Sequence, residues 1–236
     1  MLMLIGICAI LPVFVFVSKT LSRRRKHALI LMELSAALLL ISDRFAYIYN
    51  GDTSTLGMGM TRTGNFLVYT FTLVIIYAFE LYLIDLYKNE GQAEVIPKVL
   101  RISKIIILFG EIMIIISQFT GMYYTFDDSN NYQRSSFFFL SYIIPLVLMV
   151  LNIIGIIQFI KKLSSLQKTS LLLFTFVPLV ASVIQLFTFG VSLINITLVG
   201  LVVLLYVFSL VDLNNAVDKA NKQEIQLLRD DRKRCS

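Results

Sequence analysis

The chain is poor in the residues that build metal centres and catalytic sites. It has one histidine, His27, and two cysteines, Cys8 and Cys235, which lie at opposite ends of the sequence. Two distant cysteines make neither a disulfide framework nor a zinc motif. His27 stands in a basic segment, where a solvated side chain is a simpler interpretation than a catalytic base. The sequence contains no phosphate-binding glycine loop and no nucleophile elbow. We therefore expect no enzyme activity, no metal and no cofactor.

Charged residues are also scarce. They make up 15% of the chain, whereas hydrophobic residues make up 57%, and this balance excludes an ordinary soluble domain. A helix needs roughly 20 apolar residues to cross the hydrocarbon layer, because lipid satisfies no loose backbone groups. The apolar runs predict an all-α, polytopic membrane bundle of seven transmembrane helices, at about 2–18, 28–49, 66–87, 105–124, 137–160, 169–189 and 191–213.

Positive charge is confined to alternate gaps between these runs. All lysines and arginines except Arg44, Arg62 and Arg134 follow the first, third, fifth or seventh run. Short basic loops stay in the cytoplasm, so we expect the N-terminus outside and the C-terminus in the cytoplasm of a multi-pass protein of the cell membrane. The formal net charge of +6 then belongs to a rim at the lipid bilayer, and no nucleic-acid partner is expected.

The last residues change character. Residues 1–213 form the expected transmembrane sensor domain, and residues 214–236 are polar, with neither proline nor glycine. We expect the seventh helix to continue into the cytoplasm as a linker helix. One heptad stripe favours a coiled coil between two copies, although a polar residue, Glu224, interrupts it. A solvated helical extension is the alternative. The stripe consists of Leu210, Leu213, Val217, Ala220 and Leu227.

Polar and charged groups gather at the outer ends of the runs. An aromatic belt at the membrane interface explains many of the tyrosines there. It does not explain the charged and amide side chains, which need partners below the lipid headgroups. Two interpretations stay open: a pocket for an unknown extracellular small ligand, and a polar cluster that only supports the fold. The candidate ligand-binding residues are Asp43, Arg44, Asn65, Tyr69, Gln118, Tyr124, Asp127, Arg134, Gln185 and Asn195.

Three carboxylic acids lie inside the runs, where ionisable groups are costly and suggest a function. Counted from the cytoplasmic ends of their runs, Glu33, Glu80 and Glu111 are expected at one depth in the inner half of the membrane. Together they could hold a proton or a cation. Alternatively, each could be protonated and hydrogen-bonded to a neighbouring helix.

Segments 42–47, 64–69, 117–134 and 192–195 resemble the N-terminal seven-helix membrane sensor region of bacterial, clostridial-type signalling proteins. In that family the region precedes a cytoplasmic output: a histidine kinase, a diguanylate cyclase or an HD-type phosphodiesterase. No output domain follows in this sequence. The most specific match is made by Gln118, Tyr123, Tyr124, Asp127, Asn131, Tyr132 and Arg134.

The resemblance implies a sensor of a two-component or related system that receives a stimulus at its outer face and passes it through the seventh helix to a cytoplasmic output domain or protein. A small transporter or channel that uses the three carboxylates is the alternative. A third hypothesis is a scaffold that anchors partners through its tail.

Overall fold

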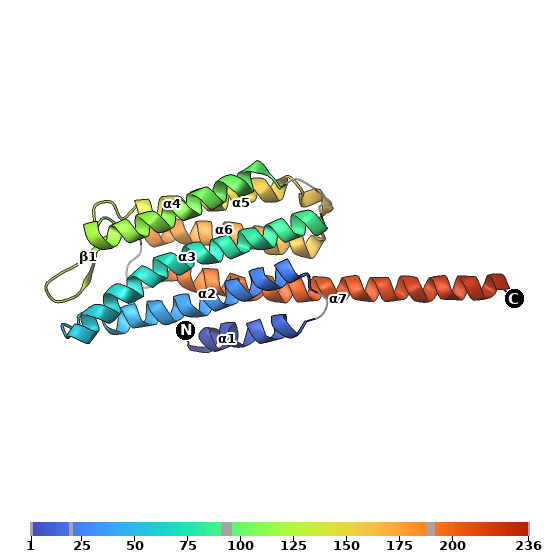
Figure 1. The fold of residues 1–236 in the computed structure, drawn as a ribbon, viewed down its shortest axis with the longest axis horizontal. Coiled ribbons are helices and arrows are strands. Elements are labelled where there is room, and N and C mark those ends of the chain that lie inside the picture. The colour runs from blue at the N-terminus through green and yellow to red at the C-terminus, as the bar shows by residue number, and fades with distance from the viewer. Residues whose placement is uncertain (1, 19–20, 91–95, 188–191, 236) are drawn as a thin grey trace.

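The computed structural model describes residues 2–18, 21–90, 96–187 and 192–235. Within these residues the chain forms an all-α bundle, which confirms the all-α part of the predicted fold class, and its helices run alternately in opposite directions (Figure 1). The helices are α1 (Leu2–Val17), α2 (Arg23–Ile48), α3 (Thr55–Asn89), α4 (Lys98–Thr120), α5 (Leu140–Ile157), α6 (Ser165–Phe187) and α7 (Leu193–Cys235), with a short 3-10 helix, η1 (Ile160–Lys162).

Four helices of the described part, α3, α5, α6 and α7, are long and apolar enough to cross a membrane. Helix α1 is apolar but shorter, and α2 and α4 are not among the four. Helix α2 carries three charged residues within its apolar stretch, Glu33, Asp43 and Arg44. The bundle therefore has the helices of the predicted membrane architecture, with the required length and apolarity in four of them.

Helix starts differ from the predicted runs because serine caps, and not the onset of apolar residues, determine them. The Ser22 hydroxyl accepts a hydrogen bond from the Arg25 amide at 3.1 Å, so α2 begins inside the basic segment. The Ser54 hydroxyl does the same for the Gly57 amide at 3.0 Å, so α3 begins well before residue 66. Such caps satisfy backbone donors that the first helical turn leaves unpaired.

The ends of α4 and α6 are capped as well. Gly121 ends α4 in the left-handed conformation, with φ of 64°, and its amide donates to the Ser117 carbonyl. Helix α4 therefore stops short of the predicted residue 124. At the start of α6, Ser164 and Gln167 form a reciprocal capping box: each side chain accepts a hydrogen bond from the other residue's amide, at 3.1 and 3.0 Å.

A short hairpin interrupts the helical pattern between α4 and α5, which the sequence did not predict. Strand β1 (Tyr124–Phe126) pairs antiparallel with β2 (Tyr132–Arg134), with Thr125 opposite Gln133. Asn130 lies in the connecting turn with φ of +58°, a conformation that asparagine tolerates better than most residues. The sequence placed Tyr124 at the end of a transmembrane run, and that placement is wrong.

All the basic connections of the described part lie at one end of the bundle, and α7 projects beyond this end (Figure 1). We call it the basic end, and the end that carries the hairpin the cavity end. Helix α7 crosses residue 213 without a break, so the predicted domain boundary falls inside one helix. Lys19 and Ser236, which the sequence assigned to basic and tail segments, lie outside the described residues.

The basic end is closed by buried ionic contacts. The Arg25 guanidinium donates to Asp85 at 2.9 Å and lies 3.4 Å from Glu90, and the Ser22 hydroxyl donates to the same Asp85 carboxylate at 2.6 Å. Arg25 is 8% exposed and Asp85 only 2%. This contact joins the start of α2 to the end of α3.

A second polar contact at the basic end holds α7. The Asp212 carboxylate accepts hydrogen bonds from the Ser164 hydroxyl and the Gln167 side-chain amide, both at 2.6 Å. Both donors belong to the capping box that starts α6, so the contact ties α7 to a rigid helix end. We call these three residues the Asp212 clamp.

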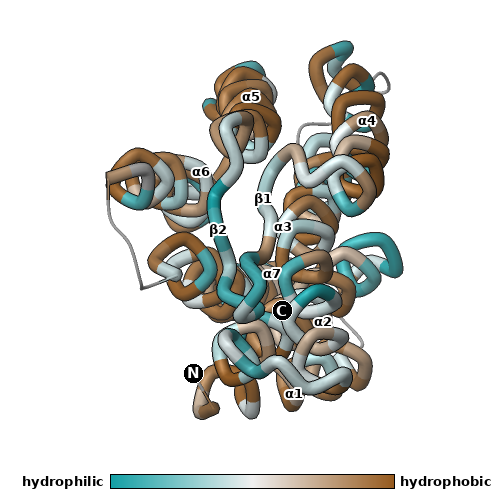
Figure 2. Tube along the Cα trace, turned by 90° about the vertical axis from the view of Figure 1, so that its left-hand side faces the viewer, coloured by the Kyte–Doolittle hydropathy of each residue, from teal (hydrophilic) through white to brown (hydrophobic). Residues whose placement is uncertain are grey.

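The interior between the two ends is apolar and well packed. Phe79 of α3 stacks on Phe174 of α6, with ring centres 4.1 Å apart. Many side chains on the outside of the bundle are apolar as well, and Figure 2 shows how many apolar residues the helices contain. On α4, for example, Ile105 is 69% exposed and Leu108 is 63% exposed. Soluble proteins rarely leave such large apolar areas in contact with water.

Candidate ligand-binding cavity

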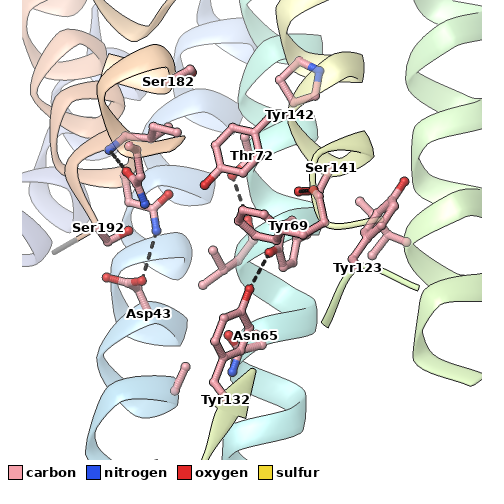
Figure 3. Close-up of a pocket in the computed structure, with 18 of the residues that line it drawn as sticks. Asp43, Asn65, Tyr69, Thr72, Tyr123, Tyr132, Ser141, Tyr142, Ser182 and Ser192 are labelled. Atoms are coloured by element: carbon pink, nitrogen blue, oxygen red, sulfur yellow. Dashed lines mark hydrogen bonds between the residues drawn. The ribbon is translucent and has the colours of Figure 1, made fainter. Parts of the chain in front are cut away.

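A cavity of about 680 Å³ lies at the cavity end, between helices α2 to α7 and the hairpin. Its volume falls in the range of small-molecule sites. Seven of the ten predicted ligand-binding residues line it, and Figure 3 shows several of them around the same space. These seven are Asp43, Arg44, Asn65, Tyr69, Arg134, Gln185 and Asn195.

The other three predicted residues do not line the cavity, and two of them, Gln118 and Tyr124, lie behind its wall. Gln118 and Tyr124 hydrogen-bond each other through the Gln118 side-chain amide, at 2.7 and 3.1 Å. The Tyr124 ring stacks against the rings of both Tyr69 and Tyr132, with centre distances of 5.4 and 5.5 Å. Because Tyr69 and Tyr132 line the cavity, Gln118 and Tyr124 support its aromatic wall from outside.

Asp127 belongs to the hairpin turn and faces water. Its carboxylate accepts hydrogen bonds from the backbone amides of Asn131 and Ser129, at 2.8 and 3.0 Å. These donors, the Asn131 amide above all, hold the pKa of Asp127 below its usual value. At the neighbouring loop, the Ser54 backbone amide lowers the pKa of Asp52 in the same way. Both carboxylates shape loops beside the cavity.

The hairpin is fastened to the loop between α2 and α3. The buried side-chain amide of Asn130 donates to the Asp52 carbonyl at 2.8 Å and to the Tyr49 carbonyl at 3.2 Å. The Tyr132 amide donates to the Asn50 side chain at 2.8 Å. These contacts bring Tyr132 against α3, where its hydroxyl lies 3.1 Å from that of Tyr69. The hairpin thus forms one wall of the cavity.

The start of α7 forms another wall and is held by two neighbouring helices. The Asn195 side-chain amide donates to the Asp43 carboxylate of α2 at 3.0 Å, and Ser192 lies beside the same carboxylate (Figure 3). The Gln185 side-chain oxygen of α6 accepts a hydrogen bond from the Ile194 amide at 2.8 Å. That amide lies in the first turn of α7, where backbone N–H groups have no acceptor within their own helix.

The two arginines of the lining differ in their surroundings. Arg134 lies over the Phe138 ring, 4.4 Å from its centre, and donates to the Gln185 carbonyl at 3.5 Å. Arg44 is exposed and makes no hydrogen bond or ion pair with any described residue. The two guanidinium groups stand against one lining carboxylate, Asp43.

Sequence reasoning missed several polar residues of the lining. Thr72 and Ser182 donate to backbone carbonyls of their own helices, and Ser141 donates to the Phe138 carbonyl just before α5, at 2.7 to 2.8 Å. Small hydroxyl residues inside apolar runs usually bond in this way, so they gave no distinct signal. Tyr142 could have been found, because it is a tyrosine within an apolar run and lies one turn before Pro145.

The three carboxylic acids do not share one level, which corrects the predicted common depth. Glu33 lies beside Cys8 of α1 and Tyr206 of α7. Glu80 lies beside Ser103 of α4. Glu111 lies beside Thr70 of α3, and Thr70 is about 15 Å from Glu80 along that helix at ~1.5 Å per residue.

These carboxylic acids lack the partners that a shared ion site would need. Both carboxyl oxygens of Glu33 and Glu80 and one of Glu111 are buried without a hydrogen-bond partner in the described part of the chain. Among the described residues, no group of three or more histidine, cysteine, aspartate or glutamate side chains could hold a metal ion.

Comparisons with family models, curated proteins and solved structures found no match for this chain.

Proposed function

We propose that this chain is the membrane-embedded sensor module of a bacterial signal-transduction protein. In this proposal all seven helices cross the cell membrane, with the N-terminus outside and the basic end in the cytoplasm. A small ligand from outside enters the cavity, and α7 carries the response to a cytoplasmic output domain or protein. The cytoplasmic output is proposed because the chain resembles seven-helix sensor regions. The direction of the signal, from the cavity along α7, is proposed because of the geometry of the site.

One observation carries the proposal: the helix that lines the cavity is also the helix that leaves the bundle. Ser192, Ile194, Asn195 and Ile196 line the cavity at the start of α7. The same helix continues without a break to Cys235, 43 residues in all, or about 64 Å at ~1.5 Å per residue. A change at Asn195 therefore has a continuous, rigid path to the basic end.

Transmission requires two arrangements of α7 that the ligand binds with different affinity. The contacts at the two ends of α7 suggest what distinguishes them. At the cavity end α7 is held through Asn195 to Asp43, and at the basic end through the Asp212 clamp. A ligand that binds Asp43 or Asn195 in place of their mutual hydrogen bond would free the start of α7. A small shift or rotation of α7 would then strain or break the hydrogen bonds of the Asp212 clamp.

The outward apolar faces support the membrane location. Phe119, near the cavity end of α4, is 87% exposed, and Phe16 of α1 is 74% exposed. Lipid tails would cover such side chains, and the basic residues at the opposite end fit the cytoplasmic rim of the bilayer.

The orientation is testable with single cysteines in a Cys8→Ala, Cys235→Ser background. We expect an impermeant maleimide to label Ser129→Cys in the hairpin of intact cells, and to label Asn215→Cys in the tail only after the cells are opened. Both positions are exposed. The reverse pattern would place the cavity in the cytoplasm and end the proposal of an extracellular sensor.

Transmission through α7 is testable by distances at the basic end. Spin labels at Ser165→Cys and Asn215→Cys, both exposed, report the position of α7 against α6 in the same cysteine-free background. We expect Asn195→Leu, which removes the contact with Asp43, to shift the distance distribution. Thr120→Val is the control, because Thr120 is exposed and donates only within α4. If Asn195→Leu leaves the distribution unchanged, α7 does not transmit.

The tail supports an oligomeric or partner-bound state within the same proposal. Residues 214–228 are exposed along the whole helix, and an isolated helix of this length is marginally stable in water. We propose a homodimer through the heptad stripe that includes Val217. Disulfide formation by Val217→Cys, but not by the off-stripe Lys219→Cys, would be the expected result. Equal cross-linking at both positions would contradict a specific coiled coil.

A further inference from the structure

The charge of the cavity lining is unbalanced. Its charged groups are the guanidinium groups of Arg44 and Arg134 and the carboxylate of Asp43. The carboxylate already accepts the hydrogen bond from Asn195 at 3.0 Å. Arg44 has no hydrogen-bond or ion-pair partner among the described residues, although Asp43 precedes it directly in the sequence. The lining therefore carries net positive charge, and an anion that approaches the exposed Arg44 guanidinium can form charge-assisted hydrogen bonds with it.

Several polar side chains at the cavity already make hydrogen bonds within the protein. Gln185 and Asn65 have their side chains engaged with the backbone, at Ile194 and at Thr61. Tyr142 lies near Arg134, and its hydroxyl makes no hydrogen bond with the described part of the chain. The Tyr142 hydroxyl could therefore donate a hydrogen bond to an anionic group held beside Arg134.

One side of the cavity is flat and aromatic. Tyr69 and Tyr132 line it, and the Tyr124 ring stacks against both of them, with the Tyr69 and Tyr124 planes only 8° apart. Leu73, Ile144 and Pro145 provide apolar surface elsewhere in the lining. The volume of about 680 Å³ is far larger than a single inorganic anion needs. The occupant should therefore have an organic body as well as a charged group.

We infer that the cavity binds a small organic anion, whose carboxylate or phosphate group is held by Arg44 and Arg134 and whose flat apolar body rests on the tyrosine wall. The anion has two conceivable sources, a free solute and the headgroup of an anionic lipid, which share this chemistry. The inference rests on the cavity being the sensory site of the proposed function and adds the chemical class of its ligand.

The test compares an acid with its neutral amide of the same shape. Indole-3-acetate and indole-3-acetamide are titrated against the purified full chain in nanodiscs of zwitterionic phosphatidylcholine, with binding measured by calorimetry and by the shift in melting temperature. We expect the acid to bind at least about tenfold more tightly than the amide. Arg44→Gln and Arg134→Gln should bring this ratio close to one.

Arg62→Gln is the matched control. Arg62 is also an arginine at the cavity end, but its guanidinium lies over the Phe126 ring, 5.9 Å from the centre, and it does not line the cavity. The acid-to-amide ratio should stay as in the wild type. A ratio that falls as much in Arg62→Gln as in Arg44→Gln would mean that surface charge, and not the cavity, attracts the acid.

A second set of nanodiscs with anionic phosphatidylglycerol separates the two sources. If indole-3-acetate binds more weakly in these nanodiscs, and if added salt does not restore its affinity, a lipid headgroup occupies the cavity. Unchanged binding indicates a free solute. Either result supports the anion class. Equal binding of acid and amide, binding of neither, or a ratio that survives both cavity substitutions would overturn it.

This outcome is separate from the test of the sensor. Selective binding of the acid without movement of α7 would remove the proposed signalling role and leave the anion site standing. If α7 moves in Asn195→Leu but the cavity shows no preference for the acid, the signalling role would stand and the anion site would be removed.

Discussion

The two ends of the bundle use similar polar groups in opposite ways. At the basic end, Asp85 receives hydrogen bonds from Arg25 and Ser22 in a contact that is almost closed to solvent. At the cavity end, Asp43 receives one from Asn195 and borders about 680 Å³ of open space. The same helix, α2, carries Arg25 and Asp43. The closely packed polar contacts of the basic end hold the helices together, whereas the polar groups of the cavity end stay accessible to a ligand.

Replacing Asp85 and Asp43 by alanine, one at a time, tests this difference between the two ends through the free energy of unfolding. Asp85→Ala leaves the Arg25 guanidinium buried without its main partner, and loss of one member of a buried pair costs about 3–5 kcal/mol of unfolding free energy. Asp43→Ala removes the hydrogen bonds with Asn195 and Ser192 beside a cavity that water can fill, which costs about 2 kcal/mol. Reversible unfolding in detergent, followed by circular dichroism, measures both.

Glu90 supplies the control at the basic end. It also faces Arg25, at 3.4 Å, but its side chain is 39% exposed, so Glu90→Ala should cost no more than about 1 kcal/mol. If Asp43→Ala were as destabilising as Asp85→Ala, the cavity end would be as important for stability as the basic end, and its polar cluster would be structural.

Gly64 sharpens the comparison at the cavity end. A Cβ atom there would lie 2.9 Å from the Ala46 nitrogen and the Ser42 carbonyl oxygen, so α2 and α3 touch through their backbones. Gly64→Ala must push the helices apart, which costs about 1–3 kcal/mol and moves Asn65 and Tyr69 in the cavity wall. We expect lower stability, measured as above, together with weaker binding of any cavity ligand.

Gly59 is the matched position on the same helix. A Cβ atom there meets nothing within 4 Å, so Gly59→Ala should stabilise α3 by up to about 1 kcal/mol through helix propensity. Equal effects at the two glycines would show that the close approach of α2 and α3 does not shape the cavity end.

Apolar runs predicted how many helices form and roughly where, because hydrophobic length is a local property. Helix starts escaped that reasoning at Ser22 and Ser54, whose hydroxyl caps extend α2 and α3 into polar sequence. The hairpin escaped it because its strands are three residues each and depend on Asn130, whose partners lie 78 and 81 residues away. No local pattern announces such a contact.

The candidate site was predictable where polar residues were unusual for their surroundings. Asp43, Arg44 and Asn195 stand out inside apolar runs, and all three line the cavity. The depth of Glu111 could not be predicted, because it depends on how α4 is shifted along α3, which is a matter of tertiary contacts such as that of Gly110 with Leu73.

The smallest expected effect concerns pH at the cavity end. The Asp127 carboxylate is held by the amides of Asn131 and Ser129, so its pKa lies below its usual value of about 3.9. A lowered pKa in the folded state means that the hairpin turn gains stability above about pH 4 and loses it as the pH falls through the folded pKa. Because Asp127 lies in the hairpin turn, the effect of its protonation should appear at the cavity end.

Carbon-13 NMR of the Asp127 carboxyl group measures the midpoint directly, and amide protection at Asn131 reports the turn. Asp127→Asn should give the low-pH protection of Asn131 at every pH, whereas Asp128→Asn should preserve the wild-type transition. Because the turn positions Asn130 and thereby Tyr132 in the cavity wall, acid should also weaken ligand binding over the same interval. A midpoint at the ordinary aspartate value would show that the amides do not hold the carboxylate in solution, and the hairpin would then be a looser wall than its hydrogen bonds indicate.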